Sequence, residues 1–194
     1  MKRIAVFCGS SSGTENIYAA QATLLGETLA DRQIEVIYGG AIVGLMGAVA
    51  NGAISRHGNV RGVIPRFLRT KEVAHEGLSE LILVDTMHER KNRMHELSDG
   101  VIALPGGFGT MEELFELLTW AQLGLHKKPI GLLNTGRFYD GLLHFVSTMV
   151  EKGFLKEANQ KMILVSEGIE DLLDQMERYT VPAVAKWLNS TKEL

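Results

Sequence analysis

Residues 100–125 read GVIALPGGFGTMEELFELLTWAQLGL and contain a strand, a turn and a helix in that order. Residues 100–104 form a short apolar run of the length expected for a buried strand. The run leads into a glycine-rich turn, residues 105–110, and residues 114–125 then repeat apolar side chains at helical spacing. This succession predicts one unit of a parallel sheet that is covered by helices.

The same alternation runs along the rest of the chain. Six further apolar runs predict strands at residues 4–8, 35–38, 60–64, 81–84, 130–133 and 162–165. Helical periodicity predicts helices at residues 17–32, 86–98 and 138–152. Because most runs are apolar at nearly every position, we expect parallel strands that are buried on both faces. The pattern predicts a doubly wound, Rossmann-like α/β fold with a parallel sheet and helices on both faces.

The length and composition are those of one globular domain, which we place at residues 1–180, followed by a short tail at residues 181–194. The net charge of −3 argues against a nucleic-acid partner, because such domains usually carry a basic surplus. No apolar stretch approaches the length of a membrane span, and the first apolar run is too short for a signal peptide. The single cysteine, Cys8, suits a reducing compartment. We therefore expect a cytoplasmic protein without a membrane partner.

Three glycine-bearing turns follow predicted strands, at residues 9–13, 39–47 and 105–110. In doubly wound folds ligands bind beyond the carboxyl ends of the strands, so these turns predict a binding site. Glycines in the third turn would let the backbone approach a ligand, and free N–H groups at the start of the next helix attract phosphate. A tight turn without a ligand is the alternative. The G-x-G-x-x-G pattern and a Walker A lysine are both missing, which disfavours NAD and ATP.

Glu113 has two interpretations. Thr110-x-x-Glu113 fits a capping box, in which the glutamate accepts a hydrogen bond from the first backbone amide of the helix. Alternatively, a carboxylate beside a phosphate loop at a helix N-terminus stays ionised and could stabilise positive charge on a ribose ring. Taken alone, these residues favour the capping box. Thr86-x-x-Glu89 fits a second capping box.

Arg90 lies on the apolar stripe of the helix predicted at residues 86–98, three residues after Met87 and four before Met94. An arginine that faces the interior needs an anionic partner, because an unpaired buried charge is costly. That partner could be an internal carboxylate, a bound phosphate or a catalytic glutamate. We interpret the neighbouring Lys91 as part of a solvated face that could also reach an anion. The six histidines lack metal-ligand spacing, so no metal site is predicted.

Arg90-Lys91, followed by Pro105-Gly-Gly-Phe-Gly-Thr-Met-Glu-Glu113, resembles the LOG ("Lonely Guy") family of cytokinin riboside 5′-monophosphate phosphoribohydrolases. Every specified position of the family pattern P-G-G-x-G-T-x-x-E is filled, and the resemblance runs from the first strand to Tyr179. It implies an N-glycosidase that converts N6-modified adenosine 5′-monophosphates into free base, either cytokinin or adenine, and ribose 5-phosphate. The resemblance also implies a homodimer and no cofactor.

The resemblance, rather than the spacing, implies the roles of individual residues. Arg90 and Glu113 would form the catalytic pair. The implied substrate-binding residues are Glu72, Arg90, Lys91, Gly106, Gly107, Phe108, Gly109, Thr110, Met111, Glu112, Glu113 and Thr119. Among them, residues 107–110 would hold the phosphate, with Lys91 beside them.

Two other functions stay open on this fold. One is a non-catalytic carrier of a phosphorylated ligand, such as a nucleotide or molybdenum cofactor, although such a carrier would need the phosphate loop without an Arg–Glu pair. The other is general hydrolysis of AMP. Proteins of this type are often labelled lysine decarboxylases, but pyridoxal phosphate chemistry needs a Schiff-base lysine with an acidic partner. Lys127 and Lys128 lie in a polar loop and offer no such pair.

Overall fold

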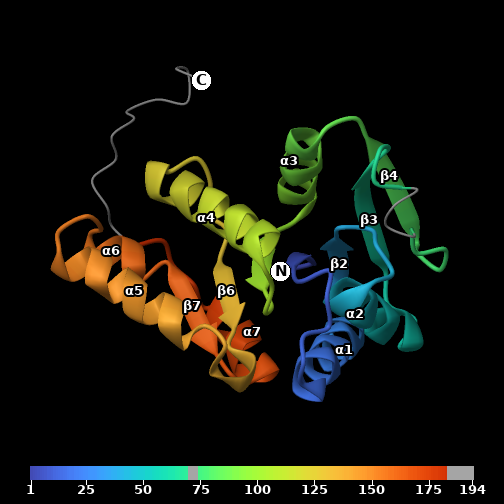
Figure 1. The fold of residues 1–194 in the computed structure, drawn as a ribbon, viewed down its shortest axis with the longest axis horizontal. Coiled ribbons are helices and arrows are strands. Elements are labelled where there is room, and N and C mark those ends of the chain that lie inside the picture. Colours follow the sequence, from blue (N-terminus) through green and yellow to red (C-terminus); the bar gives the residue numbers. More distant parts are fainter. Residues whose placement is uncertain (70–73, 183–194) are drawn as a thin grey trace.

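The computed structural model describes residues 1–69 and 74–182, which form a seven-stranded sheet with helices on both faces (Figure 1). The strands are β1 (Arg3–Phe7), β2 (Glu35–Tyr38), β3 (Val60–Pro65), β4 (Glu80–Val84), β5 (Gly100–Ala103), β6 (Ile130–Leu133) and β7 (Ile163–Ser166). The helices are α1 (Asn16–Asp31), α2 (Gly44–Ser55), α3 (Met87–Leu97), α4 (Phe108–Leu123), α5 (Asp140–Glu151), α6 (Glu157–Gln160) and α7 (Ile169–Glu177). All paired strands are parallel, so the predicted fold class is confirmed.

Successive side chains of each strand point to opposite faces, so each face of the sheet has its own hydrophobic core. In β1, Ile4 and Val6 pack with α1, α2 and α7. Ala5 and Phe7 pack with α3, α4 and α5 on the other face. The predicted burial of the strands on both faces is therefore confirmed at the central strand.

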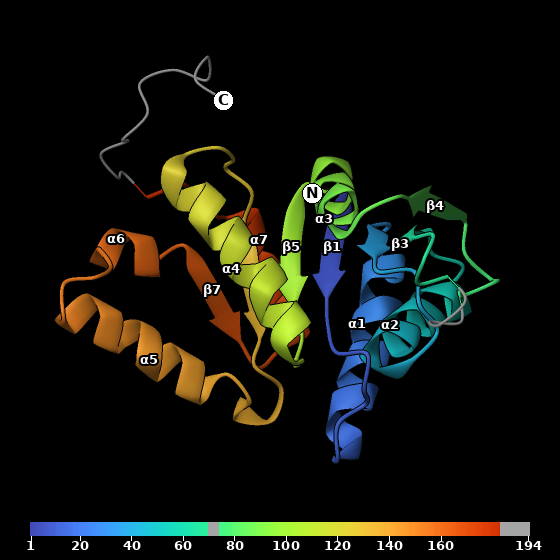
Figure 2. The same ribbon diagram turned by 45° about the horizontal axis from the view of Figure 1, so that its top comes forward.

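Helices α1 and α2 lie side by side (Figure 2) and pack closely at glycine positions. A Cβ added at Gly26 would lie 2.1 Å from the carbonyl oxygen of Val49, and one at Gly52 would lie 2.1 Å from that of Thr23. These distances are far below van der Waals contact, so the approach needs glycine at both positions. Because α1 follows the first glycine turn and α2 follows the second, this packing fixes the two turns relative to each other.

The strand order β4-β3-β2-β1-β5-β6-β7 reverses its direction of winding between β1 and β5. The chain winds outward from β1 to β4, returns to β5 beside β1, and then winds outward the other way. In open α/β sheets a crevice forms at this switch point, beyond the carboxyl ends of the strands. The amide of Gly9 donates to the carbonyl of Pro105 at 3.0 Å, and the amide of Leu45 donates to the carbonyl of Gly9 at 3.0 Å. The predicted convergence of the three glycine turns is thus confirmed.

Two helix starts differ from the prediction. Helix α2 begins at Gly44, inside the stretch that the sequence predicts as a turn. Helix α4 begins at Phe108, six residues before the apolar repeat starts at Leu114. In α4 the reason is that apolar periodicity marks only the part of a helix that packs on the core. Phe108, Gly109 and Thr110 border a cavity instead, so the apolar repeat starts further along the helix.

Candidate active site

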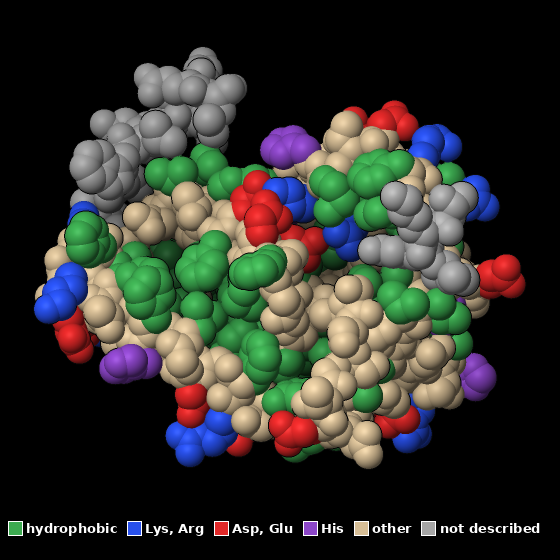
Figure 3. All heavy atoms as spheres, in the orientation of Figure 1, with side chains coloured by type: hydrophobic (Ala, Val, Ile, Leu, Met, Phe, Trp, Pro, Cys, Tyr) green, Lys and Arg blue, Asp and Glu red, His purple; other side chains and the backbone are tan. Residues whose placement is uncertain are grey.

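A cavity of about 300 Å³ lies at the switch point, between α3 and the start of α4. It is lined by Cys8, Gly9, Ser10, Met46, Leu68, Met87, Arg90, Gly107, Phe108, Gly109, Thr110, Glu112 and Glu113. Figure 3 shows acidic and basic side chains gathered at this hollow, between the ends of α3 and α4. Seven of the predicted site residues therefore line one cavity.

Arg90 and Glu113 form an ion pair at the wall of this cavity. The Nη1 atom of Arg90 donates to Oε1 of Glu113 at 3.0 Å, and its Nε donates to the carbonyl of Val63 at 3.1 Å. Arg90 is 9% exposed and Glu113 is 8% exposed. A Cβ at Gly39 would lie 2.1 Å from Nη2 of Arg90, so the second glycine turn leaves room for the guanidinium. The expected anionic partner of Arg90 is therefore Glu113.

The capping-box interpretation of Thr110 and Glu113 is wrong. The N-cap of α4 is Gly107, which leaves Thr110 and Glu113 inside the helix, and no side chain caps this end. The carboxylate of Glu113 pairs with Arg90 instead. The amides of residues 108–110 consequently have no intrahelical acceptor, and they border the cavity, as an anion site at a helix start requires.

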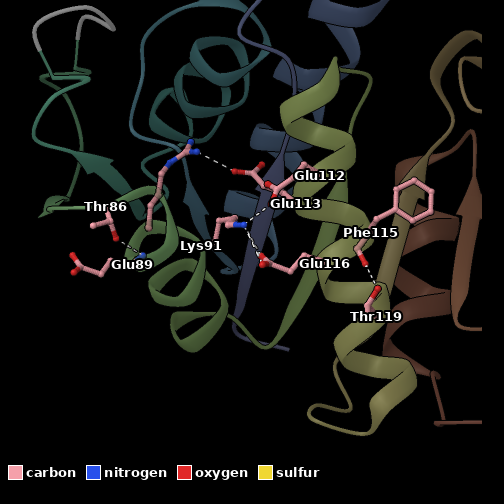
Figure 4. Close-up of polar contacts among 9 residues, drawn as sticks. Thr86, Glu89, Lys91, Glu112, Glu113, Phe115, Glu116 and Thr119 are labelled. Carbon is pink, nitrogen blue, oxygen red and sulfur yellow. Dashed lines mark hydrogen bonds and ion pairs between the residues drawn. The ribbon is translucent and has the colours of Figure 1, made fainter. Parts of the chain in front are cut away.

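The other predicted capping box is confirmed in part at the start of α3, where the Thr86 half is present. The amide of Glu89 donates to Oγ1 of Thr86 at 3.0 Å. The Glu89 carboxylate accepts a hydrogen bond from the amide of Asp85 at 2.8 Å rather than from that of Thr86. Figure 4 shows Thr86 and Glu89 at this end of α3. Arg90 lies one turn after this capped start.

The environment of Glu113 acts on its carboxyl in two opposing ways. Burial raises the pKa of Glu113 above its ordinary value, because the charged form loses its hydration. The Arg90 guanidinium lowers the pKa of Glu113 in opposition. The ionised carboxylate therefore depends on Arg90.

Lys91 is bound by two carboxylates rather than solvated. Its Nζ lies 2.5 Å from Oε1 of Glu112 and 3.0 Å from Oε2 of Glu116 (Figure 4). Burial lowers the pKa of Lys91, but the hydrogen bonds to Glu112 and Glu116 outweigh it and raise the pKa. The prediction of a solvated face is wrong here, because α3 and α4 face each other across these residues. A phosphate could reach Lys91 only in competition with Glu112 and Glu116.

The remaining predicted site residues lie in different places. Gly106 lines a second, adjoining cavity. Met111 packs against the core on the α4 side of the sheet, and its amide donates to the carbonyl of Gly107 at 3.1 Å. Thr119 lies further along α4, where its hydroxyl donates to the carbonyl of Phe115 at 2.7 Å (Figure 4). The structure brings neither Met111 nor Thr119 to the cavity, and Glu72 lies outside the described residues.

The second cavity has a volume of about 270 Å³ and shares Gly9, Ser10 and Gly107 with the first. The rest of its lining is Ser11, Ser12, Gly13, Tyr18, Leu45, Pro105, Gly106 and Phe138. Tyr18, Leu45 and Phe138 are not among the predicted site residues. For Phe138 a signal exists in the sequence, because Asn134-Thr-Gly136 follows a predicted strand and marks another turn at the same sheet edge.

Replacing Gly109 by alanine should increase stability and weaken ligand binding. A Cβ at Gly109 meets no atom within 4 Å, and the residue lines the cavity, so the methyl group would occupy cavity space. We expect Gly109→Ala to stabilise the helix by about 0.5–1 kcal/mol and to weaken nucleotide binding about tenfold or more. Thermal melting and calorimetric titration with AMP measure the two effects.

Gly141→Ala is the matched control, because Gly141 is likewise the second residue of a helix and is open to added atoms. It should give a similar stabilisation with unchanged binding. Equal nucleotide affinity in both variants would show that the start of α4 does not hold the ligand.

Neither a metal cluster nor a membrane helix is found in the described parts of the chain. No three His, Cys, Asp or Glu residues in residues 1–69 and 74–182 are grouped to hold a metal ion. No described helix is long and apolar enough to cross a membrane. The described residues that line the two cavities include no lysine, so they provide no amine for the Schiff base of pyridoxal phosphate chemistry.

The fold and the site together define a doubly wound α/β protein with a ligand cleft at its switch point, where a buried Arg–Glu pair faces an open helix start. A family model described as "Possible lysine decarboxylase" matches residues 46–176. Cytokinin riboside 5′-monophosphate phosphoribohydrolase LOG2 from Arabidopsis thaliana is 44% identical over 178 residues, covering 92% of this chain and 84% of the relative. The rice enzyme LOG is also 44% identical, over 92% of this chain and 74% of its own. The chain belongs to the LOG family.

Solved structures show the same fold in proteins of other function. The molybdenum cofactor carrier protein from Chlamydomonas reinhardtii superposes with a TM-score of 0.71 over 92% of this chain and 99% of its own. Its sequence is 20% identical. At this identity the likeness concerns the fold alone.

Proposed function

We propose that the protein hydrolyses the N-glycosidic bond of adenosine 5′-monophosphates, including N6-modified ones, and releases free base and ribose 5-phosphate. The observation that carries the proposal is the buried Arg90–Glu113 pair beside the uncapped start of α4. The names of the LOG relatives from Arabidopsis and rice support the same reaction. A role in cytokinin biosynthesis and a place in the cytoplasm are parts of this proposal.

The geometry suggests a place for each part of the substrate. The 5′-phosphate accepts hydrogen bonds from the amides of residues 108–110, where the helix dipole favours negative charge. The ribose then lies toward Glu113, and the base lies against the first two glycine turns, where Ser10 and Met46 line the cavity. Arg90 holds the Glu113 carboxylate in position.

Bond cleavage follows from the charge that this arrangement stabilises. As the C1′–N9 bond breaks, its electron pair leaves with the base and the ribose gains oxocarbenium character. The Glu113 carboxylate stabilises that positive charge and orients a water molecule toward C1′. Water forms the new C1′–O bond, and the proton that it loses balances the charge of the departing base.

The alternative is a non-catalytic carrier of a phosphorylated ligand. The likeness to the molybdenum cofactor carrier concerns the fold alone and identifies no residue that would support this alternative. A carrier would need the open start of α4 but has no use for a buried carboxylate held by arginine, whereas an enzyme needs such a carboxylate to stabilise the oxocarbenium ion. The Arg90–Glu113 pair therefore favours the enzyme.

Base release from AMP, adenosine and N6-isopentenyl-AMP tests the proposal. Both nucleotides should release base, and adenosine should react at least about 10²-fold more slowly because it lacks the phosphate that α4 binds. The ratio of the two nucleotide rates distinguishes a cytokinin-forming enzyme from one for general AMP hydrolysis. Equal rates for AMP and adenosine would contradict the assigned phosphate site.

We also propose a homodimer that forms through the exposed apolar surface over α4 and α5, which Figure 3 shows in green. Phe145 on α5 is 57% exposed, and Phe154 in the turn after α5 is 87% exposed. Large apolar patches on a protein surface mark contacts with partners. Phe145→Glu should therefore shift the protein from dimer to monomer in size-exclusion chromatography with light scattering. Leu24→Glu, at an exposed position of α1, is the control that should leave the dimer intact.

A further inference from the structure

A fourth turn at the carboxyl edge of the sheet approaches the glycine turns. It follows β6, the neighbour of β5, and includes the short 3₁₀ helix Thr135–Arg137. Gly136 and Arg137 both have left-handed backbone conformations, with φ of 59° and 61°. Such a conformation is costly for a residue with a side chain, and it persists where surrounding contacts hold it.

The contacts that hold this turn come from Asn134. Its Oδ1 accepts a hydrogen bond from the amide of Tyr139 at 2.7 Å, and its Nδ2 donates to Oδ1 of Asp140 at 2.9 Å. Asp140 also pairs with Arg137 at 2.7 Å. The turn therefore has one defined shape, and that shape determines where the Tyr139 side chain lies.

The Tyr139 hydroxyl donates to the carbonyl of Leu104 at 2.6 Å, and both residues are 1% exposed. Leu104 directly precedes the third glycine turn. The next carbonyl, that of Pro105, accepts from Gly9, and the carbonyl of Gly9 accepts from Leu45. A continuous series of contacts thus leads from the Tyr139 hydroxyl through all three glycine turns.

We infer that Tyr139 is a positioning residue, whose hydroxyl sets the third glycine turn, and with it the start of α4, against the first turn. The inference rests on the proposed function, because it concerns the phosphate held at that helix start. Tyr139 itself lines neither cavity, so it acts through Leu104 and Pro105. Loss of the hydroxyl leaves the Leu104 carbonyl buried without its donor and free to shift.

Tyr38 provides a matched control in the same sheet. It is also fully buried, and it ends β2 directly before the second glycine turn. Its hydroxyl has no hydrogen-bond partner among the described residues. Tyr38→Phe and Tyr139→Phe therefore remove the same atom from similar surroundings, but only Tyr139→Phe breaks a hydrogen bond to the site.

Calorimetric titration with ribose 5-phosphate, which the enzyme does not hydrolyse, tests the inference below the melting temperature of each variant. We expect Tyr139→Phe to bind it about tenfold more weakly and Tyr38→Phe to bind it within about twofold of the unaltered protein. The kcat/KM for AMP should fall in parallel in Tyr139→Phe. A purely structural role would lower the melting temperature and leave the dissociation constant unchanged, which would overturn the inference.

Asp140→Ala keeps the test decisive if Tyr139→Phe does not fold. Asp140 is partly exposed, so its removal loosens the Asn134 turn without opening the core. It should weaken ribose 5-phosphate binding a few-fold, and unchanged binding would count against the inference. Failure of the unaltered protein to bind ribose 5-phosphate would instead overturn the proposed function, and the inference with it.

Discussion

Glu113→Gln should reduce base release from AMP by about 10²-fold or more, while the dissociation constant for AMP changes only a few-fold. Glutamine keeps the size of the side chain and an oxygen that can accept from Arg90, so the ion pair becomes a neutral hydrogen bond. The negative charge that stabilises the developing oxocarbenium ion is lost. Single-turnover kinetics and calorimetric titration measure the chemical step and the binding separately.

Glu96→Gln is the control for this change. Glu96 also lies close to an arginine, Arg93, but both side chains are exposed on α3 and line neither cavity. An exposed pair contributes little, so this variant should keep full activity. If Glu113→Gln released base as fast as Glu96→Gln, the carboxylate would have no part in catalysis.

Arg90→Gln should lower kcat/KM for AMP by about 10²-fold and change its dependence on pH. Burial raises the pKa of Glu113 and Arg90 lowers it, so removing the guanidinium leaves the effect of burial unopposed. The ionised carboxylate is the active form, and activity is lost as the pH falls through its pKa. The acidic limb of the rate profile should therefore lie at higher pH in the variant.

The same substitution should make stability depend on pH. A carboxyl whose pKa is raised by folding favours the folded state when it is protonated, and this stability is lost as the pH rises through the folded pKa. An unpaired buried charge costs about 3–5 kcal/mol, so Arg90→Gln should melt at a lower temperature at pH 8 than at pH 5. Arg93→Gln is the exposed control. An acidic limb and a melting profile that match those of Arg93→Gln would contradict the coupling of Arg90 to Glu113.

Much of the fold could be predicted from local patterns. Strands buried on both faces are apolar throughout, and this signal alone locates all seven strands. The need of Arg90 for a buried anion could be predicted as well, because its spacing from Met87 and Met94 places a charge on an apolar stripe. The spacing does not show which anion pairs with Arg90, because the partner lies 23 residues away on another helix.

The errors arise where a local pattern competes with a tertiary contact. Thr110 and Glu113 have the spacing of a capping box, but α4 starts earlier, at Phe108, and a buried arginine binds the glutamate. The local sequence pattern predicts a solvated face at Lys91, but in the structure Lys91 faces α4 and pairs with its carboxylates. The sequence around Tyr139 or Leu104 does not predict their hydrogen bond, because it spans 35 residues and depends on a left-handed turn.

The most direct test of the central claim is the time course of products when the unaltered protein is incubated with AMP and N6-isopentenyl-AMP and the mixture is separated by chromatography. The Arg90–Glu113 pair beside the start of α4 predicts free base and ribose 5-phosphate in equal amounts, formed over many turnovers. Tight binding of either nucleotide without release of base would contradict an enzyme and identify a carrier, in which Arg90 and Glu113 stabilise the fold.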